Sequence, residues 1–119
     1  MRGSALLSLP VRVDGILLGH VVDLILDRRL TRVLGLEVRC GDGEHRFLPL
    51  AVTRLRTGEI AVSTPLALLD QPQLAFYATH GARFGTLRAT PSHGLDARVA
   101  ELDLGDAGVV ADVQLEGAA

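Results

Sequence analysis

Residues 15–38 read G-I-L-L-G-H-V-V-D-L-I-L-D-R-R-L-T-R-V-L-G-L-E-V, and this stretch decides the fold of the 119-residue chain. Two apolar runs rich in Val, Ile and Leu flank a polar connection at residues 27–31. Branched side chains favour strands, and a short polar segment between two such runs is typical of a hairpin. We therefore expect two strands, at residues 16–26 and 32–40, rather than one amphipathic helix.

The first strand has two different faces. Alternation places one largely apolar set together, namely Leu18, His20, Val22, Leu24 and Leu26. The other set is mixed and contains Leu17, Gly19, Val21, Asp23 and Ile25. A glycine inside a strand indicates a bulge or a close backbone approach, which we expect at Gly19. On this pattern, His20 is a buried, hydrogen-bonded histidine.

Further short strands surround this hairpin. We expect them at residues 6–13, 45–50 and 59–63, with Pro10 at a sheet edge or at a strand start because proline cannot donate to a ladder. Asp14-Gly15 suits a tight turn, and residues 40–44 (C-G-D-G-E) form a second strong turn signal. Strands at about ten-residue spacing predict a small antiparallel sheet or barrel.

One helix interrupts the β pattern at about residues 72–80. Pro72 suits a first helical turn, and Gly81 would be the residue after the helix. Leu74, Tyr77 and Ala78 share one face, which we expect to pack on the barrel.

The C-terminal third is β-rich. Residues 83–89 and 109–115 are predicted as strands, whereas residues 95–104 fit either a strand or a helix. The order of strand, acidic residue, turn and strand echoes residues 20–38. We therefore divide the chain into a core with the short helix, residues 1–82, and a segment 83–119 that is a degenerate half-repeat packed on the barrel.

Composition places the protein among globular domains. Apolar residues make up 48% of the chain, and the net charge of −2 does not indicate a general nucleic-acid binder. Residues 1–60 carry +2 and residues 61–119 carry −4, an asymmetry that could orient two copies. Cys40 is the single cysteine, and no apolar run approaches the ~20 residues of a membrane span. We expect a cytoplasmic protein.

No residue pattern of catalysis is found. The four histidines lack the i, i+4 spacing of a helical metal site, and no glycine-rich phosphate loop lies between a strand and a helix. We expect no catalytic residue, no metal and no cofactor. Arg28, Arg29 and Arg32 form a candidate interaction surface, and Arg54 and Arg56 form a second basic pair. The alternative is a solvated face with salt bridges to Asp23, Asp27 and Glu37.

Residues 8–64 resemble the PRC-barrel family, which includes the photosynthetic reaction centre H subunit, the C-terminal domain of a ribosome maturation factor and small stand-alone proteins. The family pattern is carried by the following residues: Gly15, Gly19, Val21, Asp23, Asp27, Val33, Gly35, Leu36, Val38, Phe47, Leu48, Pro49, Leu50, Ile60 and Val62. Gly15, Gly19, Asp23, Gly35 and Pro49 are then structural residues.

The resemblance implies a mainly β fold built on a small antiparallel PRC-type barrel. It also implies a non-enzymatic module for protein interaction or assembly, with a protein partner and self-association as a homodimer. An RNA- or ribosome-associated maturation factor is the alternative, in which the arginines contact phosphates. A role in photosynthetic complex assembly is the third.

Overall fold

The computed structural model describes residues 1–117 of the chain. It is mainly β, with 46% of residues in strands and 25% in helices. The strands are β1 Pro10–Val13, β2 Ile16–Leu26, β3 Val33–Cys40, β4 His45–Pro49, β5 Thr53–Arg56, β6 Glu59–Val62, β7 Ala82–Arg83, β8 Val99–Leu104 and β9 Val110–Leu115. The helices are α1 Gln71–His80 and α2 Phe84–Ala89, and 3₁₀ turns are η1 Gly3–Leu6, η2 Leu50–Val52, η3 Pro65–Ala67 and η4 Asp106–Gly108.

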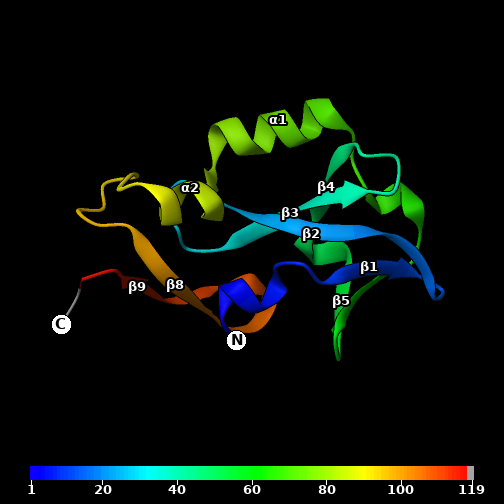
Figure 1. The fold of residues 1–119 in the computed structure, drawn as a ribbon, viewed down its shortest axis with the longest axis horizontal. Coiled ribbons are helices and arrows are strands. Elements are labelled where there is room, and N and C mark those ends of the chain that lie inside the picture. Colours follow the sequence, from blue (N-terminus) through cyan, green and yellow to red (C-terminus); the bar gives the residue numbers. More distant parts are fainter. Residues whose placement is uncertain (118–119) are drawn as a thin grey trace.

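The main sheet is curled into a half-barrel. Its strand order is β4-β3-β2-β1-β6-β5, with β7 pairing to the end of β2. β1 and β6 run parallel, and the neighbouring pairs are antiparallel. The strands at the two ends of this order, β4 and β5, are joined by the three residues of η2, so the sheet has to bend round (Figure 1).

Two layers cover the curled sheet. Helix α1 lies along one side, whereas η1 and the two-stranded β8–β9 sheet lie on the other (Figure 1). The main apolar core joins Leu24 and Leu26 of β2 to Val99 and Leu102 of β8. The C-terminal segment therefore packs on the half-barrel through shared core residues. Among residues 1–117, no helix is long and apolar enough to cross a membrane.

A bulge in β2 changes which side chains face the core. The register moves from Val21 opposite Val38 to Asp23 opposite Glu37, so Val22 has no partner in the ladder. Val21 is buried before the bulge, and Leu24 is buried after it. Simple alternation across the strand was therefore wrong. His20, expected to be buried, is exposed because it precedes the bulge on the outer face.

Helix α1 confirms the predicted helix at about residues 72–80. Leu74 is buried with Phe47 and Ile25, and the Tyr77 ring stacks on the Phe47 ring at 4.3 Å. Gly81 follows the helix as expected, but its φ of −118° is not left-handed. A Cβ there would collide with the Leu26 carbonyl oxygen, so close packing rather than backbone freedom explains the glycine.

The strand predicted at residues 83–89 is wrong. Only β7, Ala82–Arg83, is extended, and Phe84–Ala89 forms the short helix α2. Phe84 and Leu87 are both buried, which is the i, i+3 spacing of a helix face. The Asp23 Oδ1 atom accepts the Gly85 N–H at 2.9 Å, so a distant carboxylate stabilises the first turn.

The first predicted strand is shorter than expected. η1 occupies Gly3–Leu6, Ser8 has a positive φ of 69°, and the strand begins only at Pro10. The region left open as a strand or a helix contains β8, which pairs with β9. The predicted segment 83–119 also includes Ala118 and Ala119, which lie outside the described residues.

Candidate functional site

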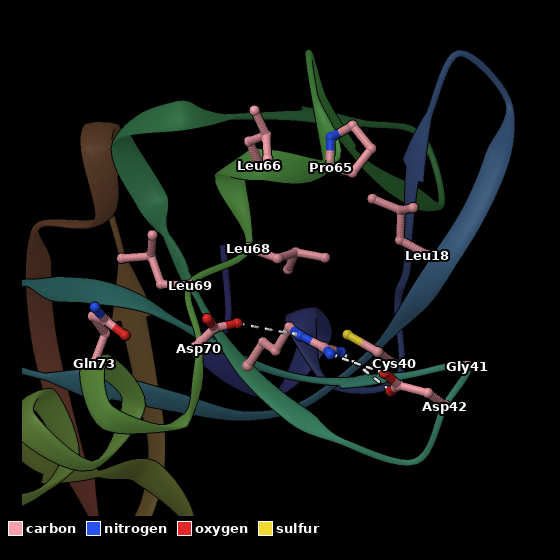
Figure 2. Close-up of a pocket in the computed structure, with 11 residues that line it drawn as sticks. Leu18, Cys40, Gly41, Asp42, Pro65, Leu66, Leu68, Leu69, Asp70 and Gln73 are labelled. Carbon is pink, nitrogen blue, oxygen red and sulfur yellow. Dashed lines mark hydrogen bonds and ion pairs between the residues drawn. The ribbon is translucent and has the colours of Figure 1, made fainter.

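An open hollow lies at the open end of the β2–β3 hairpin, opposite the loop that joins the two strands. Figure 2 shows it between Leu18 of β2, the β3–β4 turn and the η3 segment. Its volume is about 630 Å³. Pro65, Leu66, Leu68 and Leu69 supply apolar walls, and the polar side consists of Asp42, Arg46, Asp70 and Gln73.

A second hollow continues the first over the outer face of β2. The two share Leu18, Cys40, Gly41 and Asp42, and the second adds Leu17 and Val22. Leu66 is 85% exposed, and Leu17 is 47% exposed. We call five apolar residues that line these two hollows the hairpin band, defined as Leu17, Leu18, Val22, Leu66 and Leu68. An apolar centre with a polar rim is the composition of many protein interfaces.

Arg46 is fixed at the rim of the hairpin band. Its guanidinium donates to both Asp42 oxygens, at 3.1 and 2.8 Å, and lies 3.9 Å from Asp70. The hydrogen bonds from Arg46, with a second from the Glu44 N–H, lower the pKa of Asp42 to about 2. Asp42, and to a lesser extent the Cys40 thiol, raise the pKa of Arg46. This bidentate pair holds the β3–β4 turn in place beside the hollow.

A separate polar cluster lies within the sheet around Glu37, which is 7% exposed. Its carboxylate binds the Arg83 guanidinium and contacts His45 Nδ1 at 2.6 Å, and Arg83 also lies 3.7 Å from Asp23. A carboxylate on Nδ1 can orient a catalytic histidine. Here, however, the cluster joins β2, β3, β4 and β7. The backbone carbonyl of His45 also accepts a hydrogen bond from the side-chain amide of Gln71. We interpret it as a structural ion network.

The predicted arginine surface lies on the loop between β2 and β3. Arg28, Arg29 and Arg32 are all exposed, and within residues 1–117 none of their side chains forms an ion pair. The expected salt bridges to Asp23, Asp27 and Glu37 are therefore wrong, because those carboxylates have other partners. In the part of the chain that the structure describes, no side-chain hydrogen bond or ion pair joins the three arginines to a common partner.

Asp27 builds this loop. Its Oδ1 accepts the backbone N–H of Thr31 at 2.7 Å and of Arg32 at 3.1 Å, and its Oδ2 accepts the Thr31 hydroxyl. Partial burial raises the pKa of Asp27, but the hydrogen bonds from Thr31 and Arg32 lower it by more. The net pKa lies below the usual value, so the loop is stabilised by the ionised carboxylate.

Replacing Asp27 with Asn should lower the free energy of unfolding by about 1 kcal/mol at neutral pH, since one amide oxygen cannot replace two carboxylate oxygens. The folded pKa is depressed, so the Asp27 contribution is complete above about pH 4 and is lost as pH falls through the folded pKa. Urea unfolding from pH 7 down to about pH 2.5 should show the two proteins converging. The control is Asp96→Asn, an exposed loop residue; a difference that stays constant with pH would contradict the prediction.

The five predicted structural residues occupy identifiable positions. Gly15 has a φ of 78° in the β1–β2 turn, and a Cβ at Gly19 would collide with the Arg39 carbonyl oxygen. Gly35 lies opposite Pro49, the last residue of β4. Asp23 binds α2 and Arg83, as described above.

Sequence reasoning missed the hairpin band. Residues 64–69 read T-P-L-A-L-L, an apolar run that belongs to no predicted strand or helix. The signal available in the sequence for this surface was the run of apolar side chains outside any predicted strand or helix. Their exposure depends on where η3 packs, which the local sequence does not determine.

No family model matches the chain, and no curated protein matches it. Among residues 1–117, no group of three or more His, Cys, Asp or Glu side chains could hold a metal ion.

Proposed function

We propose that this chain is a non-enzymatic protein-interaction module that self-associates through the hairpin band. The observation that carries this proposal is that the two hollows share Leu18, Cys40, Gly41 and Asp42 and that each also contains an exposed leucine, Leu66 in the first and Leu17 in the second. Fully burying one exposed leucine side chain contributes about 1.5 to 3 kcal/mol. The exposed apolar side chains of this surface are Leu17, Val22 and Leu66, whereas Leu18 and Leu68 are already half-buried against the core. A second copy of the band is its natural apolar complement, as in two-fold symmetric dimers.

The fixed rim supports the same proposal. Arg46 is held between Asp42 and Asp70, so the polar border of the band is already ordered before a partner binds. Binding to a preorganised surface loses less side-chain entropy. The His45 and Glu37 side chains, in turn, are engaged with each other and with Arg83 in holding the sheet together, which favours a structural over a catalytic role.

We also propose that the curled sheet is a PRC-type barrel. The support is the placement of the family pattern: Gly15 in a tight turn, Gly19 and Gly35 at close backbone approaches, and Pro49 at the end of β4. These are positions at which a small, strongly bent sheet requires such residues. An assembly role agrees with this fold.

Light scattering and sedimentation at micromolar concentration test self-association. At about 0.5 M salt, where charge pairs are screened, we expect a mass twice the 12.6 kDa of the monomer. Leu66→Asp and Leu17→Asp should each give the monomer mass, because a carboxylate in the apolar centre is costly to desolvate.

The matched control is Phe76→Asp, an equally drastic change at a side chain that is 56% exposed on α1, away from the hairpin band. This variant should keep the dimer mass. Circular dichroism should show the same fold for all variants. A wild-type protein that stays monomeric, or a dimer that survives both leucine changes, would overturn the proposal.

A further inference from the structure

The main sheet ends in a free strand edge. β5 is the last strand in the sheet order, and it pairs with β6 on one side only. The Thr53 N–H donates to the Leu50 carbonyl of η2. Within the described part of the chain, Arg54, Leu55 and Arg56 make no backbone hydrogen bond outside the ladder with β6. The β5–β6 hairpin projects beyond the rest of the sheet (Figure 1). An unpaired edge of this kind is a template for another strand.

The side chains of β5 give this edge a chemical character. Arg54 and Arg56 lie on one face and are exposed, and Leu55 on the other face is 48% exposed. Arg56 lies opposite Glu59 in the ladder, but neither forms an ion pair among residues 1–117. The edge is therefore basic on one face and apolar on the other.

The C-terminal sheet ends in a second free edge. β9 pairs with β8, and on its other side the Val110 N–H donates to the Thr31 carbonyl at 2.8 Å. From Asp112 to Leu115, no backbone hydrogen bond outside the β8 ladder is present in the part that the structure describes. Asp112 and Gln114 are exposed, whereas Val113 and Leu115, which alternate with them, are half-buried.

An unfavourable pairing in this sheet indicates a cationic partner. Asp103 of β8 lies directly opposite Asp112 of β9. Like charges opposite each other in a ladder destabilise it. The terminal amine lies 3.5 Å from Asp103, which leaves the Asp112 carboxylate beside the free edge without an ion-pair partner in residues 1–117. A guanidinium placed next to Asp112 would offset the repulsion.

We propose that β5 of one copy pairs antiparallel with β9 of a second copy. With Leu55 opposite Val113, the alternation of the two strands places Arg56 opposite Asp112 and Arg54 opposite Gln114. Main-chain hydrogen bonds supply affinity in strand addition, and the charges and the leucine fix the register. The net charges of the two halves favour the same pairing. β5 lies in residues 1–60, which carry +2, and β9 lies in residues 61–119, which carry −4.

The occupant is a second copy because both complementary edges belong to one chain. They cannot meet within one molecule, since β5 and β9 lie toward different ends of its long axis (Figure 1). The contact is separate from the hairpin band, so it does not rest on the function proposed above. Its test can be run with the band disabled by Leu17→Asp.

A charge exchange tests the pairing. In the full-length Leu17→Asp protein, variant A adds Arg54→Glu and Arg56→Glu, and variant B adds Asp112→Arg and Gln114→Arg. Variant A alone places one carboxylate opposite Asp112 and the other opposite the neutral Gln114, and variant B alone places guanidinium groups opposite Arg56 and Arg54. An equimolar mixture of A and B restores opposite charges at both positions, between β5 of A and β9 of B. Sedimentation velocity at about 50 mM and 0.5 M salt measures the mass, and circular dichroism checks folding.

We expect the Leu17→Asp parent to exceed the 12.6 kDa monomer mass at low salt and to dissociate at high salt. A and B alone should bind at least about tenfold more weakly than the parent, and their mixture should recover its mass. A parent that is monomeric at low salt, variants that associate like the parent, or a mixture that does not recover would each overturn the pairing.

A crosslink tests the register without changing a charge. In a Cys40→Ser background, Leu55→Cys and Val113→Cys are placed on separate chains and mixed under mild oxidation. The proposed register gives a disulfide-linked dimer between the two variants. The matched control replaces Val113→Cys with Ala100→Cys, on the neighbouring strand β8. Equal crosslinking with Ala100→Cys, or none with Val113→Cys, would overturn the register.

Discussion

Replacing Phe47 with alanine should lower the free energy of unfolding by about 3 to 5 kcal/mol. The Phe47 side chain is 1% exposed and packs with Ile25 and Leu74. Its ring lies 4.3 Å from the Tyr77 ring at an interplanar angle of 9°, so the change also removes an aromatic stacking contact between β4 and α1. The cavity cannot close easily, because two backbone hydrogen bonds to Leu69 hold the Phe47 main chain.

The matched control is Phe76→Ala, on the same helix as Tyr77. Phe76 is exposed and contacts Tyr77 edge to face, so its loss should change stability by about 0.5 kcal/mol or less. Urea denaturation measures both values, and hydrogen exchange of α1 amides should rise only in the Phe47 variant. A Phe47→Ala loss below about 1 kcal/mol would show that α1 docks by other contacts.

The hairpin at residues 15–38 was predictable because its signals are local. Branched apolar residues, a polar turn and alternation all lie within a few residues of one another. The bulge at Val22 was not predictable in this way, since it depends on the register between β2 and β3. Its consequence was the wrong expectation for His20, whose side chain is exposed rather than buried.

The error at residues 83–89 has a tertiary cause. F-G-T-L-R-A is too short to be a stable helix alone, and α2 is supported by Asp23, which lies 62 residues before Gly85. The family-like pattern had marked Asp23 as a structural residue but could not identify what it binds. The spacing of Phe84 and Leu87 was the local signal that favoured a helix.

The candidate surface was less predictable than the fold. The hairpin band combines β2 with the η3 segment, and β3, β4, β5 and β6 lie between them in the chain, so neither segment indicates the surface alone. The arginines of the β2–β3 loop were conspicuous in the sequence, yet Asp27 stabilises that loop through backbone N–H groups. The loop arginines could be recognised in the sequence, whereas the hairpin band forms only in the folded chain, where β2 and the η3 segment line the same hollow.

Replacing Gly35 with alanine should lower the free energy of unfolding by about 2 to 3 kcal/mol, although the added methyl group is small. A Cβ at this position would lie 2.6 Å from the Leu48 carbonyl oxygen and still closer to Phe47 Cζ. Gly35 is held in the ladder between β2 and β4, opposite Ile25 and Pro49, so the backbone cannot move away without breaking hydrogen bonds. Thermal and urea unfolding measure the loss.

Gly41→Ala is the matched control, because no atom lies within 4 Å of a Cβ at that turn position. The same chemical change there should leave stability within about 0.5 kcal/mol, or raise it slightly by restricting the unfolded chain.

A double-mutant cycle with Phe47→Leu separates the two collisions at Gly35. Replacing the ring with the shorter leucine relieves the collision with Cζ but not the one with the Leu48 oxygen. The double variant should therefore lose less stability than the sum of the two single variants, but more than Phe47→Leu alone. Strictly additive losses would show that the Phe47 ring does not limit the space at Gly35. A double variant no less stable than Phe47→Leu alone would show that the Leu48 backbone does not limit that space.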